Sequence, residues 1–293
     1  MRKNVCFKSA YLPYLLVLPQ IVITLLFFIW PALQAISESV VIQDPFGLYS
    51  RFVWFHNFVT LFTNTDYINS LIVTLIFSLA VTILSLVGGL FFAVLANRVT
   101  RGKRIYNALL ILPYAVAPAI AGVLFRFLFD PAIGIFPYWL HYFHYTWNFT
   151  INSRQALFLI VIISAWQQVS YNFLFYLAGL QAIPRSLIES AALDGAGPFR
   201  RFWSIIFPLL SPTTFFLIVI NMLYAFFDTF GIIQIVTQGG PANATQTLVY
   251  KIYQDGFMGL DFGGSAAQSV ILMLVIIVLT IIQFKFFERS IEY

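Results

Sequence analysis

The sequence predicts an all-α integral membrane protein with six transmembrane helices, on the evidence of its composition and the length of its apolar segments. Of the 293 residues, 60% are hydrophobic, 18% are aromatic and only 9% are charged. Soluble domains carry roughly 25% charged residues, so this chain cannot cover a water-facing surface. A helix of about 20 apolar residues crosses a hydrocarbon core of roughly 30 Å. We predict one transmembrane domain over residues 1–293, with spans at about 11–33, 70–96, 105–128, 156–180, 205–227 and 265–287.

The first apolar run, 11–33, follows a positively charged start, a combination that also occurs in signal peptides. The run is long enough to span the membrane, whereas signal-peptide cores are shorter and end in a small-residue cleavage site. We therefore expect an uncleaved first helix. Pro13, Pro19 and Pro31 are expected to bend or end it.

The second and third spans carry small residues and prolines that predict close helix packing. In the second span Ser85, Gly89 and Ala93 recur every four residues and share one helical face, which lets another helix approach closely within lipid. Packing within this subunit explains such a stripe better than a ligand site does. The third span contains Pro113 and Pro118 among several alanines, so we expect it to be kinked.

The distribution of Lys and Arg predicts the orientation. Six spans place both termini on one side, and twelve of the sixteen positive residues fall on that side. By the positive-inside rule, we expect the termini and the loop at 183–204 to be cytoplasmic. The twelve are Arg2, Lys3, Lys8, Arg98, Arg101, Lys103, Arg104, Arg185, Arg200, Arg201, Lys285 and Arg289; the other side has Arg51, Arg126, Arg154 and Lys251.

Polar residues near the outer ends of the spans allow two interpretations each. His141 and His144 lie three residues apart in the loop 129–155, a spacing that suits a metal, but their aromatic neighbours favour an interfacial belt. Arg126 lies near the outer end of the third span. It either extends its charge to the interface or contacts an anionic solute.

Several spans contain polar side chains on one helical face, where burial in lipid is costly. We expect these faces either to line a translocation path or to join helices by hydrogen bonds, and the sequence leaves both possibilities open. Asp228 lies at the predicted outer end of the fifth span, where its alternative interpretation is a carboxylate exposed to water. The path candidates are Gln167, Asn172, Asn221, Tyr224, Asp228 and Gln268.

Enzyme motifs are absent from the sequence. It has no G-x-x-x-x-G-K-[ST] phosphate loop, no H-E-x-x-H pattern and no paired cysteines, so we expect neither a cofactor nor a metal in this chain. The net charge of +5 comes from positive residues concentrated on one side of the membrane, so nucleic acid is not an expected partner. A stand-alone secondary transporter, the alternative of a different class, needs carboxylates at mid-membrane, and no predicted span has Asp or Glu near its centre.

The cytoplasmic segment 183–208 has the residues of a short docking helix. Pro184 suits the first helical turn, and apolar or small residues follow at helical spacing. Asp194-Gly195 and Gly197-Pro198 end the helix. The apolar stripe comprises Ile183, Leu187, Ile188, Ala191 and Ala192, and the charged rim comprises Glu189, Asp194, Arg200 and Arg201.

This segment resembles the EAA loop of bacterial ABC importer permeases, whose pattern is E-A-A-x-x-x-G, nine residues, then I-x-L-P. Here the run is Glu189-Ser190-Ala191-x-x-Asp194-Gly195-Ala196, and Ile205-Ile206-Phe207-Pro208 follows. Ser190 replaces an alanine and Phe207 replaces the leucine, both mild departures. The resemblance implies the type I importer permease fold and a multi-pass location in the bacterial inner membrane. It also implies that Glu189, Ser190, Ala191, Asp194, Gly195 and Ala196 couple the chain to an ATPase.

A second motif, Thr237-Gln-Gly-Gly-Pro-Ala-Asn-Ala-Thr245, resembles the carbohydrate-type, MalF-like branch. Over the whole chain the likeness is closest to A-type permeases of sn-glycerol-3-phosphate importers. It therefore implies that the transported solute is sn-glycerol-3-phosphate or a related glycerophosphodiester. A neutral sugar or oligosaccharide is the alternative. The family further implies a second homologous permease, two ATPase copies that bind ATP and Mg, and a periplasmic solute-binding protein. The segments on which this likeness rests include Leu112–Pro118, Tyr224–Phe230 and Ser265–Val270.

Overall fold

The computed structural model describes residues 11–44, 48–99 and 101–290, without the side chains of 286–290. Arg2, Lys3 and Lys8 of the charge pattern therefore lie outside the described residues. By their contacts the residues form two compact units, Met1–Thr63 with Ile252–Met273 and Asn64–Lys251 with Leu274–Tyr293, which we describe separately. The single transmembrane domain expected from the sequence stays a prediction.

The first unit begins with one long apolar helix. It consists of α1 (Leu12–Thr24), a π-helical turn (Leu25–Ile29) and α2 (Trp30–Glu38), none of which contains a buried residue. The helix continues through Pro19 and ends five residues beyond the predicted span. Pro31 does not stop it; the π-helical turn directly before α2 is where the continuous helix departs from α geometry next to this proline.

A small hairpin and a short helix follow in this unit. Strand β1 (Val41–Gln43) pairs antiparallel with β2 (Ser50–Phe52), with Ile42 opposite Arg51. In α3 (His56–Thr63), the Asn57 amide donates to Ser39 O (2.9 Å) and Val41 O (3.0 Å). Three further elements belong wholly or partly to this unit: α14 (Leu248–Tyr253), a π-helical turn (Gln254–Met258) and α15 (Phe262–Ser290).

The second unit is built on two long helices that pack along each other, α4 (Thr65–Arg98) and α8 (Ser153–Ala182). Each helix begins at an asparagine whose side chain accepts two backbone N–H groups, Asn64 and Asn152. The predicted small face of α4 lies at this contact. Ser85, Gly89 and Ala93 are buried, and a Cβ atom at Gly89 would collide with Asn172 of α8.

Two of the predicted spans are broken helices. The third consists of α5 (Lys103–Ala115) and α6 (Pro118–Leu128), bent by 100°. Pro118 opens α6, and the residue before a proline disfavours the helical region, so the predicted kink is confirmed as a sharp break. In the fifth, Pro198–Leu209 is bent by 64° from α12 (Ser211–Phe227), and the predicted start at 205 falls in the segment before the bend.

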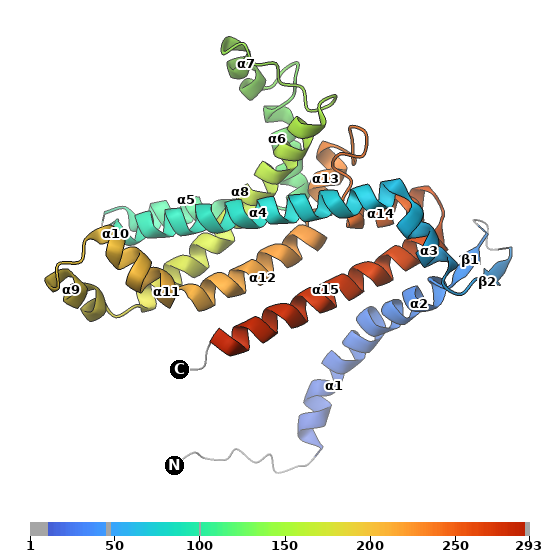
Figure 1. Ribbon diagram of the computed structural model, residues 1–293, viewed down its shortest axis with the longest axis horizontal. Coiled ribbons are helices and arrows are strands. Elements are labelled where there is room, and N and C mark those ends of the chain that lie inside the picture. The colour runs from blue at the N-terminus through green and yellow to red at the C-terminus, as the bar shows by residue number, and fades with distance from the viewer. Residues whose placement is uncertain (1–10, 45–47, 100, 291–293) are drawn as a thin grey trace. The chain divides into compact units, whose positions relative to one another are not determined.

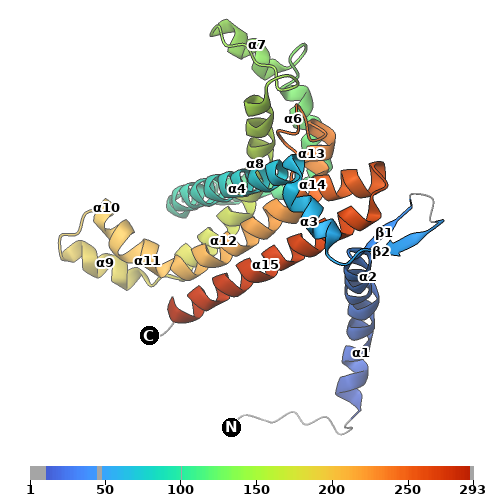
Figure 2. The ribbon, with the colours of Figure 1, turned by 45° about the vertical axis from the view of Figure 1, so that its right-hand side comes forward.

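Counting each bent pair as one span gives six candidate spans in the described part of the chain, as predicted. Within the second unit, the connections between spans lie at two ends (Figures 1 and 2). One end carries α9 (Arg185–Leu193) and α10 (Pro198–Arg201), with α11 (Phe207–Leu209) leading back to α12. The other end carries α6, α7 (Ile135–Tyr142) and α13 (Phe230–Val236).

Candidate functional site

The loop that contains α9 ends in a tight helix cap. Gly195 has a φ of +80°, the left-handed conformation that glycine adopts without steric cost. Its N–H donates to Ala192 O (3.1 Å), and the Ala196 N–H donates to Ala191 O (2.9 Å). This pair of hydrogen bonds is the Schellman motif, which satisfies the last carbonyls of a helix. The predicted end of the helix at Asp194-Gly195 is therefore confirmed.

The residues expected to couple the chain lie on a protruding surface. None of the residues of α9 is buried, and Glu189, Ser190, Asp194 and Gly195 are exposed. Only local hydrogen bonds support the cap, and a Cβ atom at Gly195 would meet nothing within 4 Å. The helix therefore keeps its shape by its own contacts while its outer surface stays open to another molecule.

The apolar residues of the loop that contains α9 fall into two groups, one packed against the rest of the unit and one exposed. Ile183 is buried and Ile188 packs beside it in the cluster formed by α4, α8 and α12, so these two anchor the loop. Leu187 is 46% exposed. Leu193 and Phe199 are 89% and 78% exposed, and sequence reasoning did not single them out as docking residues. Their apolar character beside the charged rim of the loop is the sequence signal that could have identified them.

Two of the candidate path residues, Asn172 of α8 and Asn221 of α12, bind each other. Both are fully buried, and each amide donates to the other residue's side-chain oxygen at 2.9 and 2.8 Å. Their second N–H groups donate to helix carbonyls, those of Gln168 and Leu217. In this conformation the pair joins two helices, the packing alternative left open by the sequence. A role in lining the path stays a prediction.

Gln167 connects α8 to the break in the third span. Its amide donates to Val116 O at 2.7 Å, at the point where α5 ends, and its oxygen accepts from the Tyr224 hydroxyl at 3.1 Å. Val116 O lacks an N–H partner within its own helix because the chain bends there. The side chain of Gln167 therefore satisfies a carbonyl that the bend frees, and it joins that bend to α12.

The two remaining path candidates lie elsewhere. Asp228 is exposed at the carboxyl end of α12, and partial desolvation raises the pKa of its carboxyl above the ordinary value. Gln268 belongs to the first unit, where its amide donates to Asp255 at 2.6 Å. Their role in transport is untested by this geometry and stays a prediction.

The segment 237–248 forms a strap over the amino-terminal part of α4. It contains the second sequence motif, and Thr245, Gln246 and Thr247 within it are buried. Hydrogen bonds tie the strap to successive turns of α4: Asn69 Nδ2 donates to Asn243 O (3.2 Å), Ser70 Oγ to Gln246 Oε1 (3.0 Å) and the Leu248 N–H to Thr74 Oγ1 (2.8 Å). The sequence predicted a polar outer loop here, but not these contacts.

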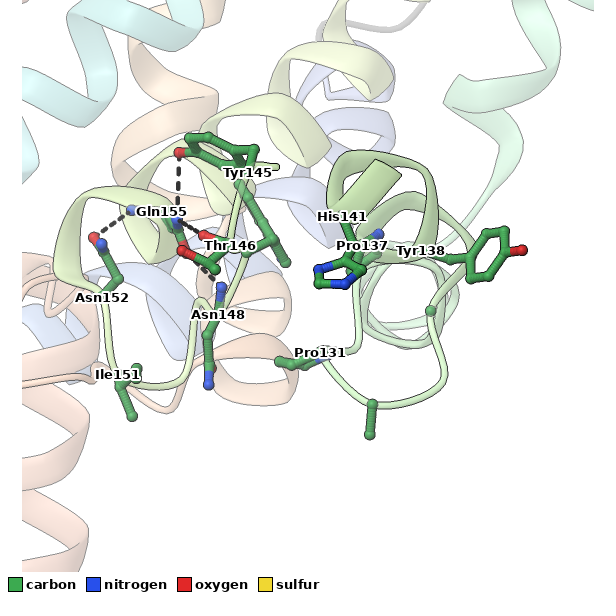
Figure 3. A pocket seen from close by; sticks show the side chains of 13 residues that line it. Pro131, Pro137, Tyr138, His141, Tyr145, Thr146, Asn148, Ile151, Asn152 and Gln155 are labelled. Atoms are coloured by element: carbon green, nitrogen blue, oxygen red, sulfur yellow. Dashed lines mark hydrogen bonds between the residues drawn. The ribbon is translucent and has the colours of Figure 1, made fainter. Parts of the chain in front are cut away.

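A cavity of about 560 Å³ lies between α7 and the segment that leads into α8 (Figure 3). His141 lines it from α7. Gln155 closes the opposite side, where its amide group hydrogen-bonds Tyr145, Thr146 and Asn148. Among the described residues, no group of three or more His, Cys, Asp or Glu is placed to hold a metal ion. The aromatic interpretation of His141 and His144 stays a prediction.

Comparison with known proteins gives both a family and close relatives. The family model described as "binding-protein-dependent transport system inner membrane component" matches residues 85–293. The sn-glycerol-3-phosphate transport system permease protein UgpA of Rhizobium meliloti (strain 1021) is 58% identical over 291 residues, 99% of each chain. The protein of the same name from Escherichia coli O157:H7 is 55% identical over 287 residues, 98% of this chain and 97% of the relative.

Solved structures share the fold at low sequence identity. One is a bacterial ABC transporter involved in the import of the acidic polysaccharide alginate, with a TM-score of 0.83, 21% identity, and coverage of 97% of this chain and 96% of the other. Another is the MetNI methionine ABC transporter in an inward-facing conformation, with a TM-score of 0.57, 16% identity, and coverage of 76% and 95%. The all-α importer-permease fold expected from the sequence is confirmed.

Proposed function

Because the chain belongs to the family of inner membrane components of binding-protein-dependent transport systems, we propose that it is the permease subunit of an ATP-driven importer of sn-glycerol-3-phosphate or related glycerophosphodiesters. The chain is a multi-pass inner-membrane protein. Identity of 55–58% over nearly the whole length to permeases named for that solute is the observation that carries the choice of solute.

The loop that contains α9 is the point at which this permease receives mechanical work. Its cap is rigid, its residues Glu189 to Gly195 are open, and exposed Leu193 and Phe199 give an approaching subunit apolar surface to bury. The excess of Lys and Arg on the same side of the predicted topology supports a cytoplasmic location for α9 and for both termini.

The proposed assembly contains this chain, a second homologous permease, a dimer of ATPase subunits and a periplasmic solute-binding protein. ATP and Mg bind to the ATPase, since this sequence lacks a phosphate loop. When ATP binding closes the ATPase dimer, α9 moves with it. The two permease halves then rock from an inward-open to an outward-open state, and the bends in the third and fifth spans divide the helices into segments that can move separately.

Uptake measurements with the complete reconstituted transporter test this proposal. Vesicles that contain all subunits should accumulate labelled sn-glycerol-3-phosphate when ATP and the binding protein are supplied, and should not accumulate maltose. Uptake of maltose alone would favour the neutral-sugar alternative. Solute uptake by this chain without any ATPase subunit would instead establish a secondary transporter and contradict the proposal.

A further inference from the structure

A second, smaller cavity of about 170 Å³ lies at the outer end of the second unit, between the end of α6 and the start of the strap. Its polar lining includes Arg126, Thr150, Thr237 and Gln238, and no described residue that lines it carries a carboxylate. A cavity with a fixed cation and no acid has the electrostatic character of an anion site.

The position of Arg126 is fixed by one strong hydrogen bond. Its Nη1 atom donates to Ile235 O at 2.6 Å, one of the last carbonyls of α13, so the side chain caps that helix. A guanidinium has five N–H donors, and this bond uses one of them. No carboxylate within the described part of the chain forms an ion pair with Arg126, and its side chain is exposed. The cap therefore holds the charge in place without neutralising it.

Gln238 supplies a neutral donor beside this charge. Its backbone N–H donates to Ile233 O at 2.8 Å and its φ is +52°, so the backbone is held in a fixed turn. The side chain is exposed, and its amide makes no hydrogen bond to the described residues. The Thr245 hydroxyl lies 2.7 Å from Thr237 Oγ1 and fixes the adjacent lining. The cavity wall is therefore largely preformed.

The other cations expected on the outer side do not offer such a site. Lys251 is buried. Arg154 lines a different cavity, whose walls are mostly aromatic and apolar residues such as Phe129 and Phe158. Arg51 belongs to the first unit. Arg126 is thus the outer cation of the second unit that combines exposure with neighbouring neutral hydrogen-bonding groups.

We propose that Arg126 and Gln238 form an outer anion site that binds the phosphoryl group of an organic phosphate before it enters the translocation path. The guanidinium fork matches phosphate oxygens, and the Gln238 amide donates to a third. Pockets that enclose a whole small ligand measure roughly 300–1,000 Å³, so this smaller cavity holds the phosphoryl group and not the complete solute. The choice of an organic phosphate rests on the proposed function, whereas the anion site itself does not.

Thiol labelling of the assembled transporter tests the site without relying on uptake. Cys6 is the only cysteine, so a Cys6→Ser, Thr150→Cys chain carries one thiol at the cavity wall. We expect an anionic methanethiosulfonate reagent to react at least about tenfold faster than a cationic one, and inorganic phosphate to slow the reaction. Arg126→Gln should remove both effects. Equal rates for the two reagents, with no protection by phosphate, would overturn the proposal.

Uptake kinetics then separate binding from helix capping. Arg126→Gln should raise the KM for sn-glycerol-3-phosphate by about tenfold or more, and Arg126→Lys should recover part of the loss; Arg154→Gln is the matched control and should leave KM unchanged. A lower amount of folded transporter with unchanged KM would show that Arg126 only caps α13, contrary to the proposal. If the wild-type transporter takes up no sn-glycerol-3-phosphate, the proposed solute fails, and the labelling result still decides the anion site.

Discussion

Two glycine-containing loops of the second unit have the same local backbone conformation and opposite surroundings. Gly195 after α9 and Gly239 in the strap both have a φ of +80°. A Cβ atom at Gly195 would meet nothing within 4 Å, whereas one at Gly239 would lie 2.8 Å from Tyr250 Cε1. The first loop is held by hydrogen bonds within a few residues, and the second by hydrogen bonds to α4.

The difference indicates two separate tasks. A loop that binds another subunit needs a shape that does not depend on the rest of the chain, so that its surface stays free. A loop that holds spans together is instead buried by long-range contacts, as Thr245, Gln246 and Thr247 are. Substitutions in the α9 loop should therefore alter coupling at constant stability, and substitutions in the strap should alter stability.

The largest expected effect is the loss of coupling in Gly195→Val. A β-branched residue is strongly disfavoured at positive φ, so the Schellman cap should break and α9 should lose its defined end. We expect solute-stimulated ATP hydrolysis by the reconstituted transporter to fall to the unstimulated level. Gly195→Asn, which tolerates the left-handed region, is the matched control and should retain stimulation. Unchanged stimulation in Gly195→Val would refute the coupling role of this loop.

Gly239→Ala should cause the largest loss of stability. Alanine is disfavoured at this positive φ, and its methyl group would also collide with the ring of Tyr250. Together the two effects should lower the free energy of unfolding by about 2–5 kcal/mol. Thermal unfolding in detergent should show a clear decrease in Tm. Gly195→Ala, with the same φ and open space, should change Tm much less. Equal decreases for the two variants would remove the distinction between the loops.

Thr74→Val should destabilise the strap by a smaller amount. Thr74 is 1% exposed, and its hydroxyl accepts the buried N–H of Leu248, which valine leaves without an acceptor. The expected cost is about 1–3 kcal/mol. Thr63→Val, at an exposed position whose hydroxyl bonds only its own helix, is the control and should have little effect. Hydrogen exchange at Leu248 should increase in Thr74→Val alone; protection that matches the wild type would contradict this prediction.

The smallest stability effect is expected for Leu193→Ser. The side chain is 89% exposed, so the free energy of unfolding should change by no more than about 0.5 kcal/mol. Binding to the ATPase subunit should nevertheless weaken, because an apolar contact is lost there. Pull-down from solubilised membranes measures the binding, and Tm measures the stability. A decrease in Tm with normal ATPase binding would show that Leu193 stabilises the fold and does not contact the ATPase subunit.

Much of the architecture follows from local sequence, because membrane crossing depends on length and hydrophobicity. The positions of α4 and α8, the kink near Pro118 and the cap at Gly195 were all predictable in this way. The reciprocal Asn172–Asn221 contact was left as one of two alternatives, since periodicity shows that residues share a face but not what covers it.

Other features depend on contacts between segments far apart in sequence. The strap could be predicted only if the contact between residues near 245 and α4 were known. The hydrogen bond from Arg126 to Ile235 O likewise joins positions 109 residues apart. No local pattern specifies these relations.

We propose that α9 contacts an ATP-hydrolysing subunit, and site-specific photo-crosslinking in native membranes can detect this contact. A photoreactive amino acid at Leu193, which is 89% exposed, should yield an adduct with an ATP-binding protein. The same group at Tyr138 of α7, which is 75% exposed at the other end of the unit, should yield none. An adduct from Tyr138 and none from Leu193 would contradict the claim.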